Sequence, residues 1–235
     1  MDRQMTQRPA VLEELTTTQL TALLRQFDES DRVSFDGHIA SYGLDQATGD
    51  GLWSWFDGGG SEYLEEPVGP DDHVRGPEDA AATVVVYGDY ECPDTRHALG
   101  SLRALEHRIG DRFRMVYRHF PRRDRHPNAQ AAAELAEEAA DWGAFWKVHD
   151  HLVDSQGALE PVNLTAYAAQ FGITGDREDD GRVVAGHRYT ERVEDDLRGG
   201  LRSGVFDTPT VYVNGRRYNG GYDMDALLAA IQLAR

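Results

Sequence analysis

The stretch Thr83-Val84-Val85-Val86-Tyr87-Gly88-Asp89-Tyr90-Glu91-Cys92-Pro93 decides the fold class of this 235-residue chain. Its first five residues form a continuous run of β-branched and aromatic side chains, which is typical of a strand buried on both faces. Pro93 suits the first turn of a helix, where its missing N–H group costs no hydrogen bond. The stretch therefore predicts a buried strand that gives way to a helix at Cys92.

The residues after Pro93 continue this pattern into a strand–helix–strand unit. Apolar residues recur at helical spacing, so a helix is expected over residues 93–109. Residues 113–120 have the composition of a second strand. Two strands that are joined through a helix form a parallel pair.

The rest of the chain is expected to add helices and then a hairpin. Helices are predicted over residues 129–142, 144–153, 163–171 and about 180–201. Asn214-Gly215 separates two strand-like runs and is a strong hairpin signal, because both residues tolerate a positive φ. Asp223 suits the N-cap of a last helix that ends at Leu233. The predicted class is α/β with the order of a thioredoxin fold: β-α-β, a helical insertion over about residues 126–200, and β-β-α.

Composition limits the classes of partner. Acidic residues number 41 against 24 basic ones, which gives a net charge of −17. A surface of this sign repels phosphate groups, so we expect no nucleic-acid partner. The first residues are polar and no stretch of about 18 apolar residues is present, so we expect no signal peptide, no membrane span and a cytoplasmic location. The single cysteine fits that compartment and excludes an internal disulfide.

Residues 1–70 are predicted to be an N-terminal extension of a domain formed by residues 71–235. Apolar residues between Leu12 and Phe27 predict one amphipathic helix. Residues 57–61 and 65–70 have the composition of a flexible loop and an extended linker. The aromatic residues Trp53, Trp55 and Phe56 either pack the extension onto the main domain or dock a protein partner, and packing is the commoner role.

Cys92 is the candidate catalytic residue because of its place between the strand and the helix. Free N–H groups and the positive end of the helix dipole favour a thiolate there, and a thiolate is the attacking group in thiol–disulfide exchange. The alternative is a buried, inert cysteine. Thr208-Pro209 precedes the hairpin, where the thioredoxin order places a cis-proline opposite the cysteine; the alternative is a trans proline that opens a strand.

Four motifs in the expected order resemble those of the DsbA-type oxidoreductases of the thioredoxin family. They are residues 87–93, residues 113–121, residues 126–132 with 143–150, and residues 208–215. Residues 72–77 also resemble the lead-in of a subgroup that is fused to some sodium/proton antiporters. The resemblance covers residues 71–235. It implies that Pro93, Asp94, Thr208 and Pro209 bind the substrate, a disulfide or thiol of a protein or of a small molecule.

The chain departs from the family at the second cysteine of the Cys-x-x-Cys motif, which here reads Cys92-Pro93-Asp94-Thr95. With Thr95 in place of the resolving cysteine, the reaction would stop at a mixed disulfide until an external thiol such as glutathione or mycothiol released it. The resemblance to monothiol relatives implies that the Thr95 hydroxyl stabilises the Cys92 thiolate, as a second catalytic residue. Asp89, Glu91 and Asp94 act against a thiolate because they add negative charge nearby, and the sequence does not decide between these effects.

Two further groups of residues suggest binding sites. Residues 118–126 form a basic stretch that we expect to be a solvated loop; the alternative is a site for an anionic thiol or an acidic partner. The histidines show no spacing typical of zinc sites, and His149 and His151 would point in different directions on a helix, so no metal is expected.

Three functions remain open from the sequence. The first is a monothiol thiol–disulfide oxidoreductase that uses Cys92 and holds no bound cofactor. The second is a redox-inactive domain that keeps the groove at Pro209 for peptide binding and docks a protein through residues 1–70. The third is glutathione-transferase or isomerase chemistry, as in kappa-class relatives with serine or threonine at this site. Retention of a cysteine at the helix start favours the first.

Overall fold

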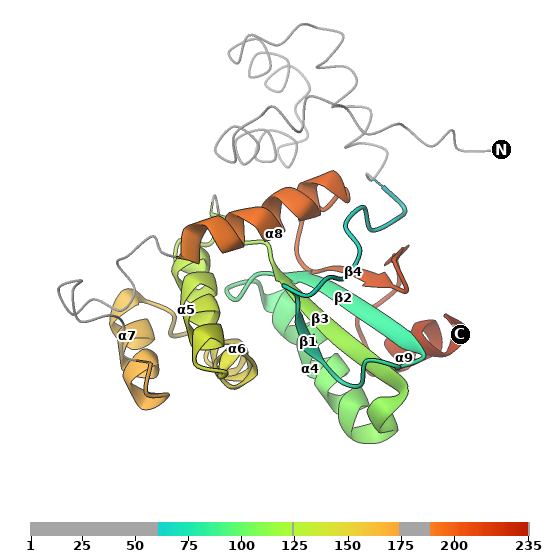
Figure 1. Ribbon diagram of the computed structural model, residues 1–235, viewed down its shortest axis with the longest axis horizontal. Helices are drawn as coiled ribbons and strands as arrows, with labels where there is room; N and C mark the ends of the chain where they lie inside the picture. The colour runs from blue at the N-terminus through green and yellow to red at the C-terminus, as the bar shows by residue number, and fades with distance from the viewer. Residues whose placement is uncertain (1–60, 124, 174–188, 235) are drawn as a thin grey trace, which may run out of the picture.

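The order of helices and strands is the one that the sequence predicts. The computed structural model describes residues 61–123, 125–173 and 189–234 (Figure 1). In chain order and with the labels of Figure 1, the elements are β1 (His73–Arg75), β2 (Ala82–Gly88), α4 (Pro93–Ile109), a 3-10 turn (Gly110–Arg112), β3 (Phe113–His119), α5 (Ala129–Asp141), α6 (Phe145–Asp154), α7 (Pro161–Gln170), α8 (Thr190–Arg202), β4 (Thr210–Val213), β5 (Arg216–Tyr218) and α9 (Met224–Leu233). The predicted β-α-β unit, helical insertion and β-β-α unit are confirmed.

A five-stranded sheet in the order β1-β3-β2-β4-β5 forms the centre of the domain. The central strand β2 runs parallel to β3 and antiparallel to β4. All its residues except Thr83 are buried, as expected for a strand covered on both faces. The edge strand β1 pairs antiparallel with β3. The sequence does not predict β1, because three residues are too few for an alternating pattern to show.

Helices cover both faces of the sheet. Successive side chains of a strand point to opposite faces, so Val84 and Val86 pack in one apolar cluster with residues of α4 and α9. On the other face, Tyr87 lies against Gly200 of α8. Figure 1 shows α4 and α8 on opposite sides of the sheet, with α5, α6 and α7 stacked to one side. Within the described ranges, no helix is long and apolar enough to cross a bilayer.

Local chemistry fixes the turns near the C-terminus. Asn214 and Gly215 have φ values of 49° and 77°, so the predicted Asn-Gly hairpin is confirmed. The Asp223 carboxylate accepts a hydrogen bond of 3.0 Å from the backbone N–H group of Ala226, which is the predicted N-cap of α9.

The segment before β1 lies against the domain. The carbonyl group of Glu62 accepts a 2.7 Å hydrogen bond from the N–H group of Arg217, and the N–H group of Leu64 donates to the carbonyl group of Gly215 at 2.8 Å. The predicted linker over residues 65–70 is therefore held by the domain, with the Glu66 carbonyl group accepting from Arg118. The predicted helix between Leu12 and Phe27, the residues Trp53, Trp55 and Phe56, and nearly all of the predicted loop at 57–61 lie outside the described residues.

The predicted helix at about 180–201 differs from the structure at its start. Residues 174–188 lie outside the described ranges, and the described helix α8 begins at Thr190 and ends at Arg202. The other helices end within two residues of their predicted bounds, which is the usual uncertainty of helix ends.

Candidate functional site: the thiol at the start of α4

Cys92 is the N-cap residue of α4, and Pro93 begins the helix. The backbone of Cys92 is extended, with φ −76° and ψ 118°, and no side chain caps this end of the helix. The first N–H groups of a helix have no partner within it, and an N-cap side chain is placed to accept hydrogen bonds from them. A thiolate at Cys92 is therefore placed to accept hydrogen bonds from these N–H groups, from which no side chain of the described residues accepts.

The Cys92 thiol points to the loop before β4. It is 6% exposed, and its Sγ donates to the carbonyl oxygen of Thr208 at 3.0 Å. The Thr208–Pro209 peptide bond is cis. The Thr208 hydroxyl group is buried beside this contact and has no hydrogen-bond partner among the described residues. The fold thus brings Cys92, Thr208 and Pro209 together at one point.

Thr95 lies one turn into α4 and is 1% exposed. Its hydroxyl oxygen accepts a long hydrogen bond of 3.4 Å from the N–H group of Asp89. It makes no hydrogen bond to Cys92 in this structure, so the expected contact with the thiolate stays a prediction. Pro93 and Asp94 are exposed at the mouth of the site.

Asp89 has a structural role that the sequence does not suggest. Its buried carboxylate accepts from the N–H groups of Glu91 and Arg122, each at 2.7 Å. The same carboxylate lies 2.8 Å from Nδ1 of His126, and this hydrogen bond raises the pKa of His126. Asp89 therefore joins the loop that carries Cys92 to the loop that follows β3, and His126 faces its negative charge.

Glu91 is also bound within the site. Its carboxylate accepts from the backbone N–H group of Asn128 at 2.6 Å and from the side-chain amide of Asn128 at 2.9 Å. Of the three carboxylates next to Cys92 in sequence, Asp89 and Glu91 thus have fixed partners, whereas Asp94 is exposed to solvent. Water screens an exposed charge, so Asp94 opposes a thiolate less than its proximity in sequence suggests.

The expectation that residues 118–126 form a solvated loop is wrong for the first half of the stretch. Arg122 is 2% exposed, and its Nη1 donates to the carbonyl oxygen of Phe206 at 2.7 Å and to Asp207 at 3.0 Å. Arg118 is also buried and binds both carboxylate oxygens of Asp72. The planar guanidinium group satisfies several acceptors at once, which makes such burial tolerable.

Residues of metal-binding types meet between the sheet and the insertion. One ligand atom each of His119, Glu137 and Asp196 lies within 4.8 Å of the others, and all three side chains are buried. Nε2 of His119 lies 2.9 Å from Glu137 at an angle poor for a hydrogen bond, and Nε2 of His73 lies 2.8 Å from the same oxygen. Burial acts to raise the pKa of Glu137, but His119 and His73 outweigh it and lower that pKa. The absence of a metal from this cluster stays a prediction.

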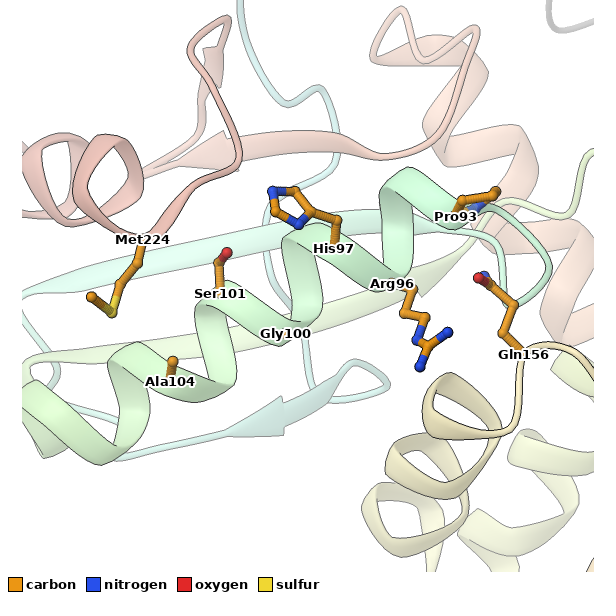
Figure 2. Close-up of a pocket in the computed structure, with 8 residues that line it drawn as sticks. All are labelled: Pro93, Arg96, His97, Gly100, Ser101, Ala104, Gln156 and Met224. Carbon is orange, nitrogen blue, oxygen red and sulfur yellow. The ribbon is translucent and has the colours of Figure 1, made fainter.

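An open cavity of about 520 Å³ lies along α4 from Pro93, the residue after Cys92 (Figure 2). It is lined by Pro93, Arg96, His97, Gly100, Ser101, Ala104, Gln156 and Met224. The side-chain amide of Gln156 donates to the carbonyl oxygens of Tyr90 at 2.9 Å and Cys92 at 2.7 Å. Gln156 therefore links the wall of the cavity to the loop that carries the thiol. The sequence gives no sign of this role, because Gln156 lies in the connection between α6 and α7.

Comparison with known proteins gives matches over the same part of the chain. A family model described as Thioredoxin matches residues 69–233. The Na(+)/H(+) antiporter NhaA 1 of Salinispora arenicola is 46% identical over 172 residues, which are 73% of this chain and 26% of that protein. NhaA of Herminiimonas arsenicoxydans is 42% identical over 176 residues, again 73% of this chain and 27% of that protein. The chain thus spans about a quarter of the length of these curated relatives.

Solved structures share the fold. BdbD from Bacillus subtilis superposes with a TM-score of 0.62 at 21% identity, covering 74% of this chain and 98% of that one. α-DsbA1 from Wolbachia pipientis does so with a TM-score of 0.57 at 14% identity, covering 73% of this chain and 94% of that one. The predicted fold, and the predicted likeness to DsbA-type proteins and to a segment of sodium/proton antiporters, are confirmed by these matches.

Proposed function

Because this chain belongs to the thioredoxin family, we propose that it is a monothiol thiol–disulfide oxidoreductase in which Cys92 is the attacking group. The observation that carries the proposal is the position of the thiol. Cys92 Sγ lies at the uncapped start of α4 and 3.0 Å from the carbonyl oxygen that precedes the cis-proline Pro209. Free helix N–H groups stabilise the thiolate form of Cys92, which is the form that attacks a disulfide.

The reaction has two steps. The Cys92 thiolate attacks one sulfur of a disulfide, a new S–S bond forms to Cys92, and the second sulfur leaves as a thiolate that takes up a proton from water. An external thiolate then attacks the mixed disulfide, which returns Cys92 to its reduced state and transfers the bound group to the external thiol. We propose glutathione or mycothiol as that external thiol and the cytoplasm as the compartment that supplies it.

Four neighbours of Cys92 have proposed roles in binding and alignment. The Thr95 hydroxyl already accepts from Asp89, so its own proton is free to hydrogen-bond the thiolate. Thr208 and Pro209 align the substrate along the loop before β4, and the unpartnered Thr208 hydroxyl group offers a further hydrogen bond. Pro93 and Asp94, which are exposed at the mouth of the site, contact the departing group.

The ion pair between Asp89 and His126 supports the same chemistry. Because its pKa is raised, His126 stays protonated to a higher pH than a free histidine. Its positive charge offsets the buried carboxylate of Asp89, which would otherwise oppose a thiolate at Cys92.

The test is the reaction of the native protein with oxidised glutathione, followed by intact-mass spectrometry. We expect one glutathione adduct per chain, its removal by reduced glutathione, and no adduct on the Cys92→Ser variant. The Thr95→Val variant keeps the size of the side chain and loses its hydroxyl group, so we expect slower formation of the adduct. An adduct that forms only after addition of denaturant would show that Cys92 is inert in the folded protein and would refute the proposal.

A second candidate function is a redox-inactive peptide-binding domain, and the low exposure of Cys92 favours it. Cys92 as a residue is only 6% exposed, and its sulfur, which already donates to Thr208, must change partner before it reacts. This candidate predicts an unreactive native thiol together with peptide binding that survives the Cys92→Ser change. Transferase or isomerase chemistry would instead require turnover of a substrate that is not a disulfide.

A further inference from the structure

The cavity beside Cys92, called here the α4 pocket, lies along one face of the helix that the thiol begins. Six of its lining residues are Pro93, Arg96, His97, Gly100, Ser101 and Ala104. They recur at steps of three and four positions, so they share one face of α4. Gln156 and Met224 complete the lining from the two sides of the helix (Figure 2). The pocket adjoins Cys92 through Pro93, the next residue of the chain, and through Gln156, which donates a hydrogen bond to the Cys92 carbonyl group.

The charge of the α4 pocket is opposite to that of the chain. None of its eight lining residues is acidic, although the chain has 41 aspartates and glutamates and a net charge of −17. Arg96 makes no ion pair with any residue in the described ranges. The nearby carboxylate of Asp154 is instead held by Arg103, through two hydrogen bonds of 3.0 and 2.8 Å. The guanidinium group of Arg96 is thus left available to an anion.

The remaining lining of the pocket suits a short peptide. A side chain at Gly100 would meet nothing within 4 Å, so the pocket is open over this residue. The amide nitrogen of Gln156 is used by the Tyr90 and Cys92 carbonyl groups, while its amide oxygen accepts no hydrogen bond from the described residues and is left for a ligand N–H group. Figure 2 shows the Arg96 side chain directed to the Gln156 side of α4, whereas His97 and Ser101 point to the other side.

We infer that the α4 pocket selects carboxylate-bearing disulfides for Cys92, and that Arg96 binds the carboxylate group. The inference rests on the proposed function and names its substrate class: short anionic peptidic disulfides such as oxidised glutathione, in preference to uncharged ones. Arg96 follows Cys92 by four residues, a rise of about 6 Å along the helix. Two residues of an extended peptide span about 7 Å, so a carboxylate at the end of such a thiol reaches this distance.

The test compares three disulfides of different charge. Rates of adduct formation at Cys92 are measured with oxidised glutathione, which is anionic, with hydroxyethyl disulfide, which is uncharged, and with cystamine, which is cationic. The chains compared are the wild type, Arg96→Gln, and the control Arg108→Gln. The control removes the same charge from an exposed position of the same helix, about 18 Å from Arg96 along the axis.

We expect Arg96→Gln to slow the reaction with oxidised glutathione relative to hydroxyethyl disulfide by up to about fivefold, which is the upper end of the range for one exposed ion pair. Cystamine should react with this variant at least as fast as with the wild type, and Arg108→Gln should leave all three rates unchanged. Added salt should reduce the difference between the wild type and Arg96→Gln, because it screens the charge.

The outcomes separate this inference from the proposed function. If Cys92 reacts with all three disulfides and Arg96→Gln leaves their rate ratios unchanged, the pocket does not select by charge and only this inference is wrong. If both arginine variants slow oxidised glutathione equally, the effect belongs to the overall charge and the inference is again wrong. If native Cys92 reacts with none of the three, the proposed function fails and the selection fails with it.

Discussion

Replacement of Thr95 with cysteine would give the chain the second thiol of a Cys-x-x-Cys motif. Thr95 is 1% exposed at the first turn of α4, with its hydroxyl oxygen 3.4 Å from the Asp89 nitrogen and its methyl group against Gly88. Cysteine lacks that methyl group and exchanges the hydroxyl for a thiol. Loss of one buried methyl group costs about 1 kcal/mol, and loss of a long hydrogen bond costs at most about the same. Against a typical total stability of about 5–15 kcal/mol, the variant should fold.

The kinetic effect of this change should be much larger than its effect on stability. In the wild type, a mixed disulfide on Cys92 persists until an external thiol attacks it. In Thr95→Cys the resolving thiol belongs to the same helix turn, and its effective concentration is in the range of about 10 mM or more. Against about 1 mM external glutathione, this shortens the lifetime of the adduct by about tenfold or more. The product should be an internal disulfide between residues 92 and 95.

The assay follows the glutathione adduct by acid quenching and intact-mass spectrometry at successive times. The control is Thr95→Ser, which loses the methyl group and keeps the hydroxyl, and which should retain the adduct as the wild type does. An adduct that persists equally in Thr95→Cys and in Thr95→Ser would show that position 95 does not face the sulfur of Cys92. That result would refute the placement of Thr95 in the site.

Three other changes test the packing around the site. Asp72→Asn leaves the buried guanidinium of Arg118 without its carboxylate, so we expect the free energy of unfolding in urea to fall by about 3–5 kcal/mol. The control is Asp154→Asn, which breaks the more exposed pair with Arg103 and should lower the free energy of unfolding by less than about 1 kcal/mol. Equal losses would contradict the difference in burial. Gly88→Ala places a Cβ atom 2.6 Å from Cε2 of Tyr117, so we expect a loss of about 1–3 kcal/mol, while Gly100→Ala, which meets nothing, should lose none. Burial lowers the pKa of His149 well below its ordinary value, so the unfolded chain binds that proton more tightly. Stability should therefore fall as the pH drops below about 6.5, by up to about 1.4 kcal/mol per pH unit, and this part of the slope should be absent in His149→Gln.

Local patterns in the sequence determined the order of the elements and the position of the thiol. The β-branched run before Cys92, the proline after it and the Asn-Gly turn each act within a few residues, so they can be recognised without the rest of the chain. The same holds for Asp223 as an N-cap, whose partner Ala226 is three residues away. These signals are enough for the thioredoxin order and for Cys92 as the candidate catalytic residue.

Only the tertiary structure decided which side chains surround the thiol. Cys92 and Thr208 are 116 positions apart, and Asp89 and His126 are 37 apart. From the sequence, Asp89 is expected only to repel a thiolate at Cys92. Its pairing with His126 leaves no recognisable pattern in either segment, so the sequence does not predict it. Hydrogen bonds and ion pairs between distant segments form only once the sheet and helices have brought them together, so neither the partners of Asp89 nor the pocket beside Cys92 can be derived from the sequence.

The basic stretch, residues 118–126, shows most clearly that the sequence does not predict contacts between distant segments. A row of arginines is ordinarily a solvated surface, and the strand predicted over residues 113–120 does not by itself show that Arg118 is buried. Arg118 and Arg122 are buried because Asp72, from before β1, and Phe206 and Asp207, from before β4, supply acceptors at the right positions. Whether a charged side chain is buried depends on whether its charge is matched in three dimensions, and this matching is decided by the fold as a whole.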